Sequence, residues 1–431
     1  MKPQLLIGAL NSGSGKTTFT MGFLRLLKRQ GLQVQPYKCG PDYIDTQFHS
    51  LASGAPSVNL DTWLASEEHV RYLYSSYGKD ADVCVVEGVM GLFDGYSRMK
   101  GSSAEMAALM DIPVLLLVNA RSIAYSVAPL ISGLANFSPN VRIIGVVFNQ
   151  VSSISHYAHL QEACKDVGVE CFGYLPYTKS LRIPSRQLGL AFGAKKRMDL
   201  QMDQAAELIE KYVDVGRLLE VCERPFPVCE EKQDSSGNLT IAVAKDEAFN
   251  FVYRENLAQL DRLGKILYFS PLKGDALPAA DLVYFPGGYP ELFAHRLQKQ
   301  ERLMNELKKY VENGGRLLAE CGGMIFLSRL LITRTGEKRY MMSGILPLDC
   351  TMENDSLHLG YRKMNVAGSE WRGHEFHYSN VVSPEAIHSV VTQQNAKGMD
   401  VSTPLYRYKN VIAGFTHWYW GEKKIMDLWD L

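Results

Sequence analysis

LLIGALNSGSGKTT, residues 5–18, decides the fold of the first half of the chain. An apolar run ends here, a loop rich in glycine and serine follows, and residues 16–18 open a helical stretch. Gly13 and Gly15 let backbone N–H groups curl round a phosphate, and the following helix directs the positive end of its dipole at the same anion. The layout predicts a phosphate-binding loop, although Leu10 stands where the usual spacing has its first glycine.

The loop residues have distinct expected roles in binding ATP. Lys16 would reach the β- and γ-phosphates, and the Thr17 hydroxyl would bind Mg²⁺. The alternative, an ordinary turn before a helix, is disfavoured by the strand–GSGKTT–helix context. The expected ATP-binding residues are Gly13, Ser14, Gly15, Lys16, Thr17 and Thr18.

The chain has 431 residues, too many for one hydrophobic core, so we expect two domains. Continuous apolar runs alternate with helical stretches such as 17–29 and 103–110. Such runs are typical of parallel strands covered on both faces, and the alternation predicts an α/β fold with a doubly wound parallel sheet. The expected strands of the first domain are QLLIGAL (4–10), LQVQPYK (32–38), DVCVVEG (82–88), PVLLLVN (113–119) and RIIGVVFN (142–149).

A change of composition separates the two domains. CERPFPVCEEKQDSSGN, residues 222–238, is rich in proline, charge and small polar residues, which indicates a linker. A second run of alternating elements begins with LTIAVAKD at 239–246. We therefore expect an ATP-binding domain over 1–222, a linker over 223–238 and a second domain over 239–431.

Charge and cysteine usage exclude several classes of partner. Lys plus Arg and Asp plus Glu both total 46, so no global field points to nucleic acid or to an anionic membrane. The eight cysteines are scattered without a C-x-x-C pair, which suggests a reducing cytosol and neither zinc nor disulfides. The start lacks signal-peptide features, and the run IPVLLLV (112–118) is too short to span a bilayer. We expect a soluble cytoplasmic protein that binds neither nucleic acid nor membrane.

Acidic residues follow two further strands of the first domain. YKCGPDYID (37–45) contains Asp42 and Asp45, and DVCVV ends in Glu87. Mg²⁺ prefers oxygen ligands and usually takes one or two carboxylates beside phosphate and water. The expected set is Thr17, Glu87 and either Asp42 or Asp45. Solvated loop carboxylates are the alternative, which is weakest for Glu87 because an acid that closes an apolar strand is costly to place.

Basic residues in the same domain are candidates for an anionic substrate. Lys38 would neutralise a substrate carboxylate or pair with Asp42, and the sequence does not decide between these. The loop SLRIPSRQLGL (180–190) carries Arg182 and Arg186, whose planar guanidinium groups suit carboxylates. A solvated basic loop is the alternative.

The second domain is organised by GRLLAECGGM, residues 315–324. We expect a strand over 316–319, a sharp turn at Gly322-Gly323, and a helix over MIFLSRLL (324–331). This geometry is that of a nucleophile elbow, with Cys321 at the tip, where we expect the helix dipole to lower the pKa of its thiol. A buried structural cysteine is the alternative.

The nucleophile needs an oxyanion site and a base. DLVYFPGGYPEL (281–292) ends a strand at a glycine pair, and the N–H groups of Gly288 and Gly322 could stabilise an oxyanion. Candidate bases are His374, His377 and His417. We prefer His417, because it follows the apolar run VIAGF; the other two flank Glu375 and would be structural or shape the cleft.

Eight motifs, in order from about residue 3 to about 420, resemble the cobyrinic acid a,c-diamide synthase family. They are GSGKTT, YKCGPDYID, NLDTWL, VEGVMGLFDG, LRIPSRQLGL, YFPGGYPEL, AECGGM and RGHEFHYS. The resemblance implies a dethiobiotin-synthetase-like P-loop domain joined to a class I glutamine amidotransferase-like domain. Glutamine would be hydrolysed in the second domain, and ammonia would pass to the first. There, ATP would phosphorylate the c and then the a carboxylate of the corrin, and ammonia would displace phosphate.

The resemblance also implies roles for individual residues. Cys321 would be the nucleophile, His417 its base, and Lys16, Thr17 and Glu87 the MgATP groups. Trp418-Tyr419 stand where class I enzymes usually have Pro-Glu, so no third triad carboxylate is assigned. The expected partners are a corrinoid polycarboxylate, glutamine and ATP, and a homodimer is a further hypothesis.

Other classes of protein share some of these sequence features and are alternatives to this function. A nucleotide switch of the partitioning type would carry a lysine five positions before the loop lysine, where this chain has Asn11, and would have no use for Cys321. A regulatory protein with a degenerate glutaminase domain is disfavoured by the intact Cys321 and His417. The same chemistry on hydrogenobyrinic acid or nickel sirohydrochlorin is the close alternative, because ring and metal are recognised by pocket shape.

Overall fold

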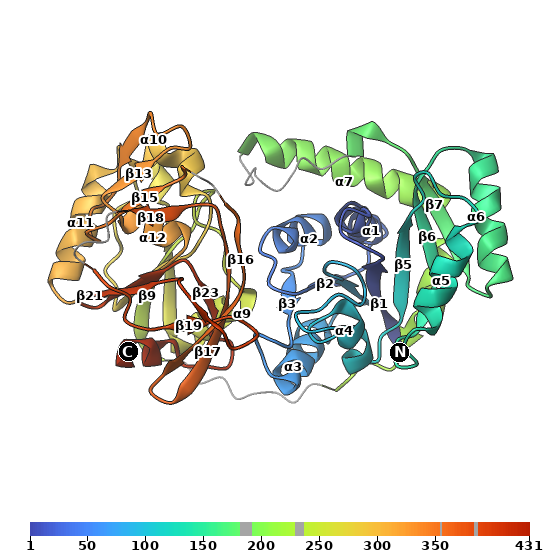
Figure 1. The fold of residues 1–431 in the computed structure, drawn as a ribbon, viewed down its shortest axis with the longest axis horizontal. Helices are drawn as coiled ribbons and strands as arrows, with labels where there is room; N and C mark the ends of the chain where they lie inside the picture. Colours follow the sequence, from blue (N-terminus) through green and yellow to red (C-terminus); the bar gives the residue numbers. More distant parts are fainter. Residues whose placement is uncertain (182–191, 229–236, 354–355, 383–386) are drawn as a thin grey trace. The chain divides into compact units, whose positions relative to one another are not determined.

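A computed structural model describes residues 1–181, 192–228, 237–353, 356–382 and 387–431. The described chain forms two compact units, the first built on strands β1–β8 and the second on β9–β23 (Figure 1). Part of the expected linker, residues 229–236, lies outside the described residues, as do Arg182 and Arg186. Within the described part of the chain, no helix has the length and apolar character needed to cross a membrane.

The first unit contains one sheet in the order β3-β2-β4-β1-β5-β6-β7, with every neighbouring pair parallel. The predicted parallel sheet is therefore confirmed. Its strands are buried apolar runs for most of their length, as strands covered on both faces must be. The strands are β1 (Lys2–Ala9), β2 (Val34–Cys39), β3 (Val58–Leu60), β4 (Val83–Glu87), β5 (Val114–Asn119), β6 (Ile143–Val151) and β7 (Cys171–Pro176).

Helices cover this sheet on both faces (Figure 1). Helix α1 contacts α2 and α7, and these three lie together on one face, whereas α3 and α4 contact each other on the opposite face. The helices of the unit are α1 (Lys16–Arg29), α2 (Asp45–Ser53), α3 (Glu67–Gly78), α4 (Ser103–Met110), α5 (Val127–Asn136), α6 (Ile154–Asp166), α7 (Phe192–Tyr212) and α8 (Val215–Val221), with the 3₁₀ helix η1 (Lys179–Leu181).

The second unit is centred on a six-stranded sheet in the order β10-β9-β11-β12-β22-β21, in which only β21 is antiparallel to its neighbour. Its strands are β9 (Leu239–Ala244), β10 (Gly264–Phe269), β11 (Leu282–Phe285), β12 (Arg316–Glu320), β21 (Leu405–Tyr408) and β22 (Val411–Gly414). The helices are α9 (Arg254–Leu263), α10 (Ala294–Leu297), α11 (Glu301–Glu312), α12 (Gly322–Leu327), η2 (Pro271–Lys273), η3 (Pro290–Phe293) and η4 (Ile425–Asp430).

Two smaller sheets complete the second unit. One has the order β14-β13-β15-β18, and the other has the order β20-β19-β16-β17-β23. Their strands are β13 (Leu330–Ile332), β14 (Arg339–Met341), β15 (Asp349–Thr351), β16 (His358–Val366), β17 (Ser369–His377), β18 (Asn380–Val382), β19 (Gln393–Gln394), β20 (Asp400–Val401) and β23 (His417–Tyr419).

The boundaries of two elements differ from the sequence expectation. The helix expected over 324–331 begins earlier, at Gly322, because the sharp turn expected at Gly322-Gly323 is made by Cys321 instead. It ends at Leu327, because the Ser328 hydroxyl donates to the Ile325 and Leu330 carbonyls and the chain then forms β13. Glu223 and Arg224, which we assigned to the linker, form a short strand, β8 (Glu223–Arg224), antiparallel to β1. The segment just before Pro225 is extended, as the residue before a proline prefers.

Two helix glycines give a matched test of packing in the first unit. A Cβ on Gly22 would lie 2.6 Å from the Ala205 Cβ and 2.9 Å from the Ala205 carbonyl carbon, whereas a Cβ on Gly133 would meet nothing within 4 Å. We predict that Gly22→Ala lowers the unfolding free energy, because overpacking costs about 1–3 kcal/mol and exceeds the gain of up to ~1 kcal/mol in helix propensity. Gly133→Ala should be neutral or stabilising. Thermal melts of the two variants test this, and equal shifts would contradict close α1–α7 packing.

Candidate active sites

The phosphate loop lies between β1 and α1, at the carboxyl edge of the first sheet. Gly13 has φ 79° and Gly15 has φ 98°, conformations that favour glycine. A Cβ on Gly15 would also lie 2.2 Å from the Asn149 amide nitrogen, which donates to the Ser14 carbonyl at 2.8 Å. Both glycines are therefore required by the backbone, and Asn149 ties the loop to the end of β6.

The two functional side chains of the loop point toward the ends of neighbouring strands. Lys16 Nζ donates to the Met90 carbonyl at 2.6 Å, in the loop that follows β4. The Thr17 hydroxyl donates to Glu87 Oε1 at 2.8 Å and lies 3.4 Å from Asp45 Oδ2. The structure thus brings together the phosphate loop and two of the three expected acids.

Strand register places Lys38 beside Glu87. The two residues are Cα partners in the parallel pair β2–β4, so their side chains leave adjacent strands on the same face. Lys38 Nζ lies 2.8 Å from Glu87 Oε1 and 2.8 Å from Asp45 Oδ2. All three side chains are buried, which makes this a buried ion cluster rather than a surface salt bridge.

Helix α2 supplies the other side of the cluster. Asp45 is its first residue, and His49 follows one turn later on the same face. His49 Nε2 lies 2.6 Å from Glu87 Oε2, and His49 Nδ1 lies 3.3 Å from the Ser57 hydroxyl. Asp42 has a different place: its Oδ1 accepts the N–H groups of Ile44 and Asp45 and so holds the turn that presents Asp45.

Electrostatics keep Glu87 and Lys38 ionised. Burial alone would raise the pKa of Glu87, but Lys38 and His49 outweigh it and hold this pKa well below its usual range. Burial alone would likewise lower the pKa of Lys38, but Asp45 and Glu87 outweigh it and raise this pKa. Two buried carboxylates and the Thr17 hydroxyl therefore present oxygen atoms to a cation, which is the donor set that Mg²⁺ prefers.

The second site lies at the carboxyl edge of the other sheet. Strands β11, β12 and β22 are parallel neighbours, and the glycine turn at 287–288, Cys321 and the segment before His417 follow their respective ends. The N–H of Cys321 donates to the Gly414 carbonyl at 2.7 Å. Residues far apart in sequence are thus brought to one place by the strand order.

Cys321 occupies a strained turn. Its φ of 47° and ψ of −106° are unusual for a residue other than glycine, as expected for a nucleophile elbow between β12 and α12. A Cβ on Gly322 would lie 2.9 Å from the Gly288 nitrogen, and a Cβ on Gly323 would lie 2.3 Å from the Phe285 carbonyl oxygen. Both glycines are needed because the turn lies directly against the loop that follows β11.

His417 lies against the same loop. A Cβ on Gly287 would lie 2.1 Å from His417 Cε1, so only glycine permits this contact. Burial, together with His374 and His377, lowers the pKa of His417 to about 3. Burial and the nearby Glu291 raise the pKa of Cys321, so the lowered thiol pKa expected from the helix dipole is wrong. At neutral pH the two side chains are therefore a thiol and a neutral imidazole, which is the protonation state from which an imidazole accepts a proton, although a general base is most effective when its pKa is near the working pH.

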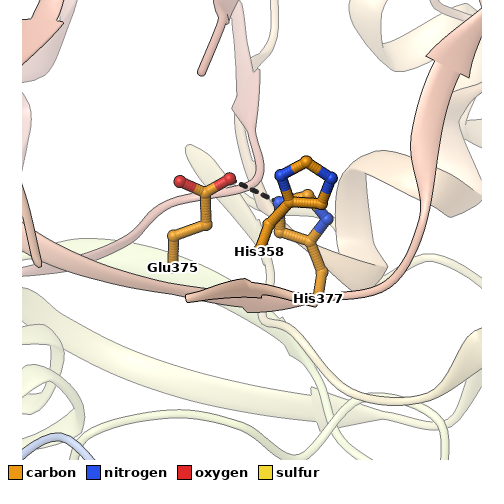
Figure 2. Close-up of side chains that lie close together, drawn as sticks. All are labelled: His358, Glu375 and His377. Atoms are coloured by element: carbon orange, nitrogen blue, oxygen red, sulfur yellow. Dashed lines mark hydrogen bonds and ion pairs between the residues drawn. The ribbon is translucent and has the colours of Figure 1, made fainter. Parts of the chain in front are cut away.

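The other two candidate bases lie on β17. His374 is the Cα partner of His417 in the β17–β23 pair, and its ring packs edge-on against Tyr361. His377 Nδ1 lies 2.7 Å from the Ser379 carbonyl, and its Nε2 lies 2.5 Å from Glu375 Oε1 (Figure 2). Since a carbonyl only accepts, Nδ1 carries a proton and His377 is fixed in orientation.

Glu375, His377 and His358 form a cluster whose nitrogen and oxygen atoms could hold a metal ion (Figure 2). The His377–Glu375 separation of 2.5 Å is that of a hydrogen bond, shorter than the roughly 3 Å between two ligands of one zinc ion. The rings of His358 and His377 stack at 9°, so their in-plane lone pairs do not converge. Thr403 and Arg362 hold the other Glu375 oxygen. The cluster therefore supports the strand that lies beside His417.

Sequence reasoning missed two buried side chains at these sites. His49 follows Asp45 by four residues, and that helical spacing was the available signal. Glu320 directly precedes Cys321 and is 2 % exposed, but a polar residue at a strand end gives no indication of its partners.

Comparisons with known proteins agree across both units. Residues 5–190 match the CobQ/CobB/MinD/ParA nucleotide binding domain, and residues 240–425 match the CobB/CobQ-like glutamine amidotransferase domain. The chain is 35% identical to a cobyrinate a,c-diamide synthase of Priestia megaterium, over 99% of this chain and 96% of that protein. It is 37% identical to one of Caldanaerobacter subterraneus subsp. tengcongensis, over 96% and 94%. It is 38% identical to a hydrogenobyrinate a,c-diamide synthase of Brucella abortus, over 96% and 97%.

The thiol state of Cys321 gives a pH prediction. Its raised pKa leaves little thiolate at neutral pH, so alkylation by iodoacetamide should rise about tenfold per pH unit from pH 6 to 9 without levelling off. Labelling at Cys321, followed by peptide mass spectrometry, measures this. His417→Gln should leave the slope unchanged, because a neutral imidazole does not stabilise a thiolate. A plateau near pH 7 that His417→Gln abolishes would show a thiolate–imidazolium pair instead.

Proposed function

The chain belongs to the family of cobyrinate and hydrogenobyrinate a,c-diamide synthases, and from that premise we propose that it amidates two side-chain carboxylates of a corrin precursor, with ATP and glutamine as co-substrates. It is thus a glutamine-hydrolysing carbon–nitrogen ligase of cobalamin biosynthesis. The observation that carries the proposal is that one chain contains both a phosphate loop with buried acids and a strained cysteine turn, packed against a glycine loop that also contacts a buried histidine.

We propose that ammonia is made at Cys321. His417 takes the thiol proton as the sulfur attacks the side-chain amide carbon of glutamine, and the N–H groups of Gly288 and Gly322 stabilise the resulting oxyanion. The protonated His417 then gives its proton to the leaving ammonia, and water hydrolyses the thioester to glutamate. Close contact of Gly287 with His417 and of Gly288 with Gly322 supports this arrangement.

We propose that the carboxylate is activated at the phosphate loop. A corrin carboxylate attacks the γ-phosphate of ATP and releases ADP, and ammonia then attacks the acyl phosphate and releases phosphate. Lys16 and the α1 N-terminus bind the phosphates, and Lys38 adds a cation between Asp45 and Glu87. Thr17, Asp45 and Glu87 would hold Mg²⁺, which offsets phosphate charge when bound. Asp42 supports this set through the turn before Asp45.

The corrin itself is either cobyrinic acid or its metal-free counterpart. We propose cobyrinic acid, and the identity of 37–38% to hydrogenobyrinate enzymes makes hydrogenobyrinic acid the second candidate. Arg182 and Arg186 are proposed contacts for its carboxylates. Mass spectrometry of the products from each corrin with ATP and glutamine tests this. Two mass steps of amidation on one corrin and none on the other would identify the substrate, and none on either would refute the proposal.

Cys321→Ser should abolish amidation with glutamine but leave amidation with added ammonia, because only the nitrogen source is lost. Product formation is measured with each donor. Lys16→Ala is the complementary variant. It should lose amidation activity with both nitrogen donors, while its Cys321 can still be alkylated. Equal loss with both donors in Cys321→Ser would place this residue in folding or in the synthetase site.

Glu87→Gln should lower kcat strongly and raise the Mg²⁺ requirement, since it keeps the size of the side chain but removes a charge from the buried cluster. A misplaced metal costs several kcal/mol of transition-state stabilisation, whereas a solvated acid costs under about 1 kcal/mol. The measurement is kcat against Mg²⁺ concentration, together with ATP affinity with and without Mg²⁺. Glu162→Gln, at a side chain that is 66% exposed, is the control. Superimposable curves for Glu87→Gln and the parent would refute a metal role.

A further inference from the structure

Cys321 and His417 are held by strands of different sheets. Cys321 follows β12 in the six-stranded sheet, whereas His417 begins β23, which is paired with β17 in the five-stranded sheet. Ladder hydrogen bonds therefore fix His417 relative to β17 but not relative to Cys321. The bond from the Cys321 N–H to the Gly414 carbonyl ends three residues before His417, so a further contact is needed to set the distance between the thiol and the imidazole.

Glu320 makes that connection. It is the last residue of β12, directly before Cys321, and it is 2 % exposed. Its Oε1 accepts the backbone N–H of Trp418 at 2.9 Å, and its Oε2 accepts the Tyr284 hydroxyl at 2.7 Å. Trp418 directly follows His417, and Tyr284 lies on β11, three residues before the glycine turn at 287–288. One carboxyl group thus joins the strand ends that carry the nucleophile, the base and the oxyanion loop.

The surroundings make this carboxyl costly to bury. It lies against the apolar cluster that contains Leu318, Tyr284, Trp418 and Trp420. A buried carboxyl group lowers stability unless its hydrogen bonds are satisfied, and an apolar residue would fill this place without that cost. Burial raises the pKa of Glu320 to about 8, so the group is largely uncharged at neutral pH. It acts through hydrogen bonds rather than through charge.

A second side chain holds the same strand from helix α9. Asn256 Nδ2 donates to the Trp418 carbonyl at 2.8 Å, and Asn256 Oδ1 accepts the Trp420 N–H at 2.9 Å. The edge of β23 that faces away from β17 is therefore bound by two side chains. Asn256 anchors β23 to α9, and of the two only Glu320 also adjoins Cys321.

We propose that Glu320 is a positioning residue of the glutaminase site, where it sets the separation of Cys321 and His417 by holding β23 against β12. The proposal rests on the proposed roles of Cys321 and His417. In enzymes with a catalytic triad, a carboxylate orients the histidine. Here a neutral carboxyl group would perform part of that task through its hydrogen bonds.

The test compares Glu320→Ala with Glu320→Gln, which can still accept from Trp418 and bond to the Tyr284 hydroxyl. We expect Glu320→Ala to lower the glutaminase kcat about 10²-fold with little change in the KM for glutamine, since a misplacement of about 1 Å has that effect. Glu320→Gln should stay near the parent. Amidation with added ammonia and the alkylation rate of Cys321 should be unchanged in both variants.

The outcomes separate this proposal from the proposed function. A parent enzyme without glutamine-dependent amidation would refute the proposed function itself. With an active parent, full glutaminase activity in Glu320→Ala, equal loss with both nitrogen donors, or equal loss in the Gln variant would each overturn the positioning role. If Glu320→Ala does not fold, Tyr284→Phe is the second variant, since it removes only one hydroxyl group. It should lower glutaminase activity roughly 2- to 10-fold through one lost hydrogen bond. Unchanged activity in Tyr284→Phe would overturn the proposal as well.

Discussion

Hydrogen bonds between parallel strands place the carboxyl ends of neighbouring strands at one edge of each sheet, and both sites lie at such an edge. In the first unit, β1 and β4 pair so that the phosphate loop and Glu87 follow adjacent strand ends. In the second, β11 and β12 pair so that the glycine turn and Cys321 do the same. If that pairing were lost, none of these side chains would remain near its partners.

The first site is built from buried charged side chains that pair with one another. Lys38, Asp45, Glu87 and His49 satisfy one another in the interior, and removal of any one would leave an uncompensated buried group. Such a cluster is rigid, because each side chain is held by at least one other. It keeps a Glu87 oxygen directed at Thr17 of the phosphate loop, where a cation would compete with Lys38 for the carboxylate oxygens and a triphosphate would compete with the carboxylates for Lys38.

The second site depends on close backbone approach and on few charges. Gly287 and Gly322 allow the β11 loop to contact His417 and the Cys321 turn. Burial keeps thiol and imidazole neutral, so reactivity depends on their separation rather than on a standing ion pair. In the proposed glutaminase site, the bonds of Glu320 to Trp418 and Tyr284 would therefore serve the chemistry as well as the fold.

The sequence by itself determined the parallel α/β architecture, the phosphate loop and the cysteine elbow, because each depends on local signals: apolar runs, glycine spacing and the residues that directly follow a strand. It also placed Glu87 at a strand end, and eight ordered motifs indicated the family. Only the tertiary structure decided that Lys38 pairs with Asp45 and Glu87, that His49 binds Glu87, and that Glu320 reaches Trp418. Strand β8 was likewise set by a tertiary contact, its pairing with β1. The side-chain partners named above at the two sites are 7 to 98 residues apart in sequence. Strand order and register bring such residues together, and no local pattern in the chain encodes either.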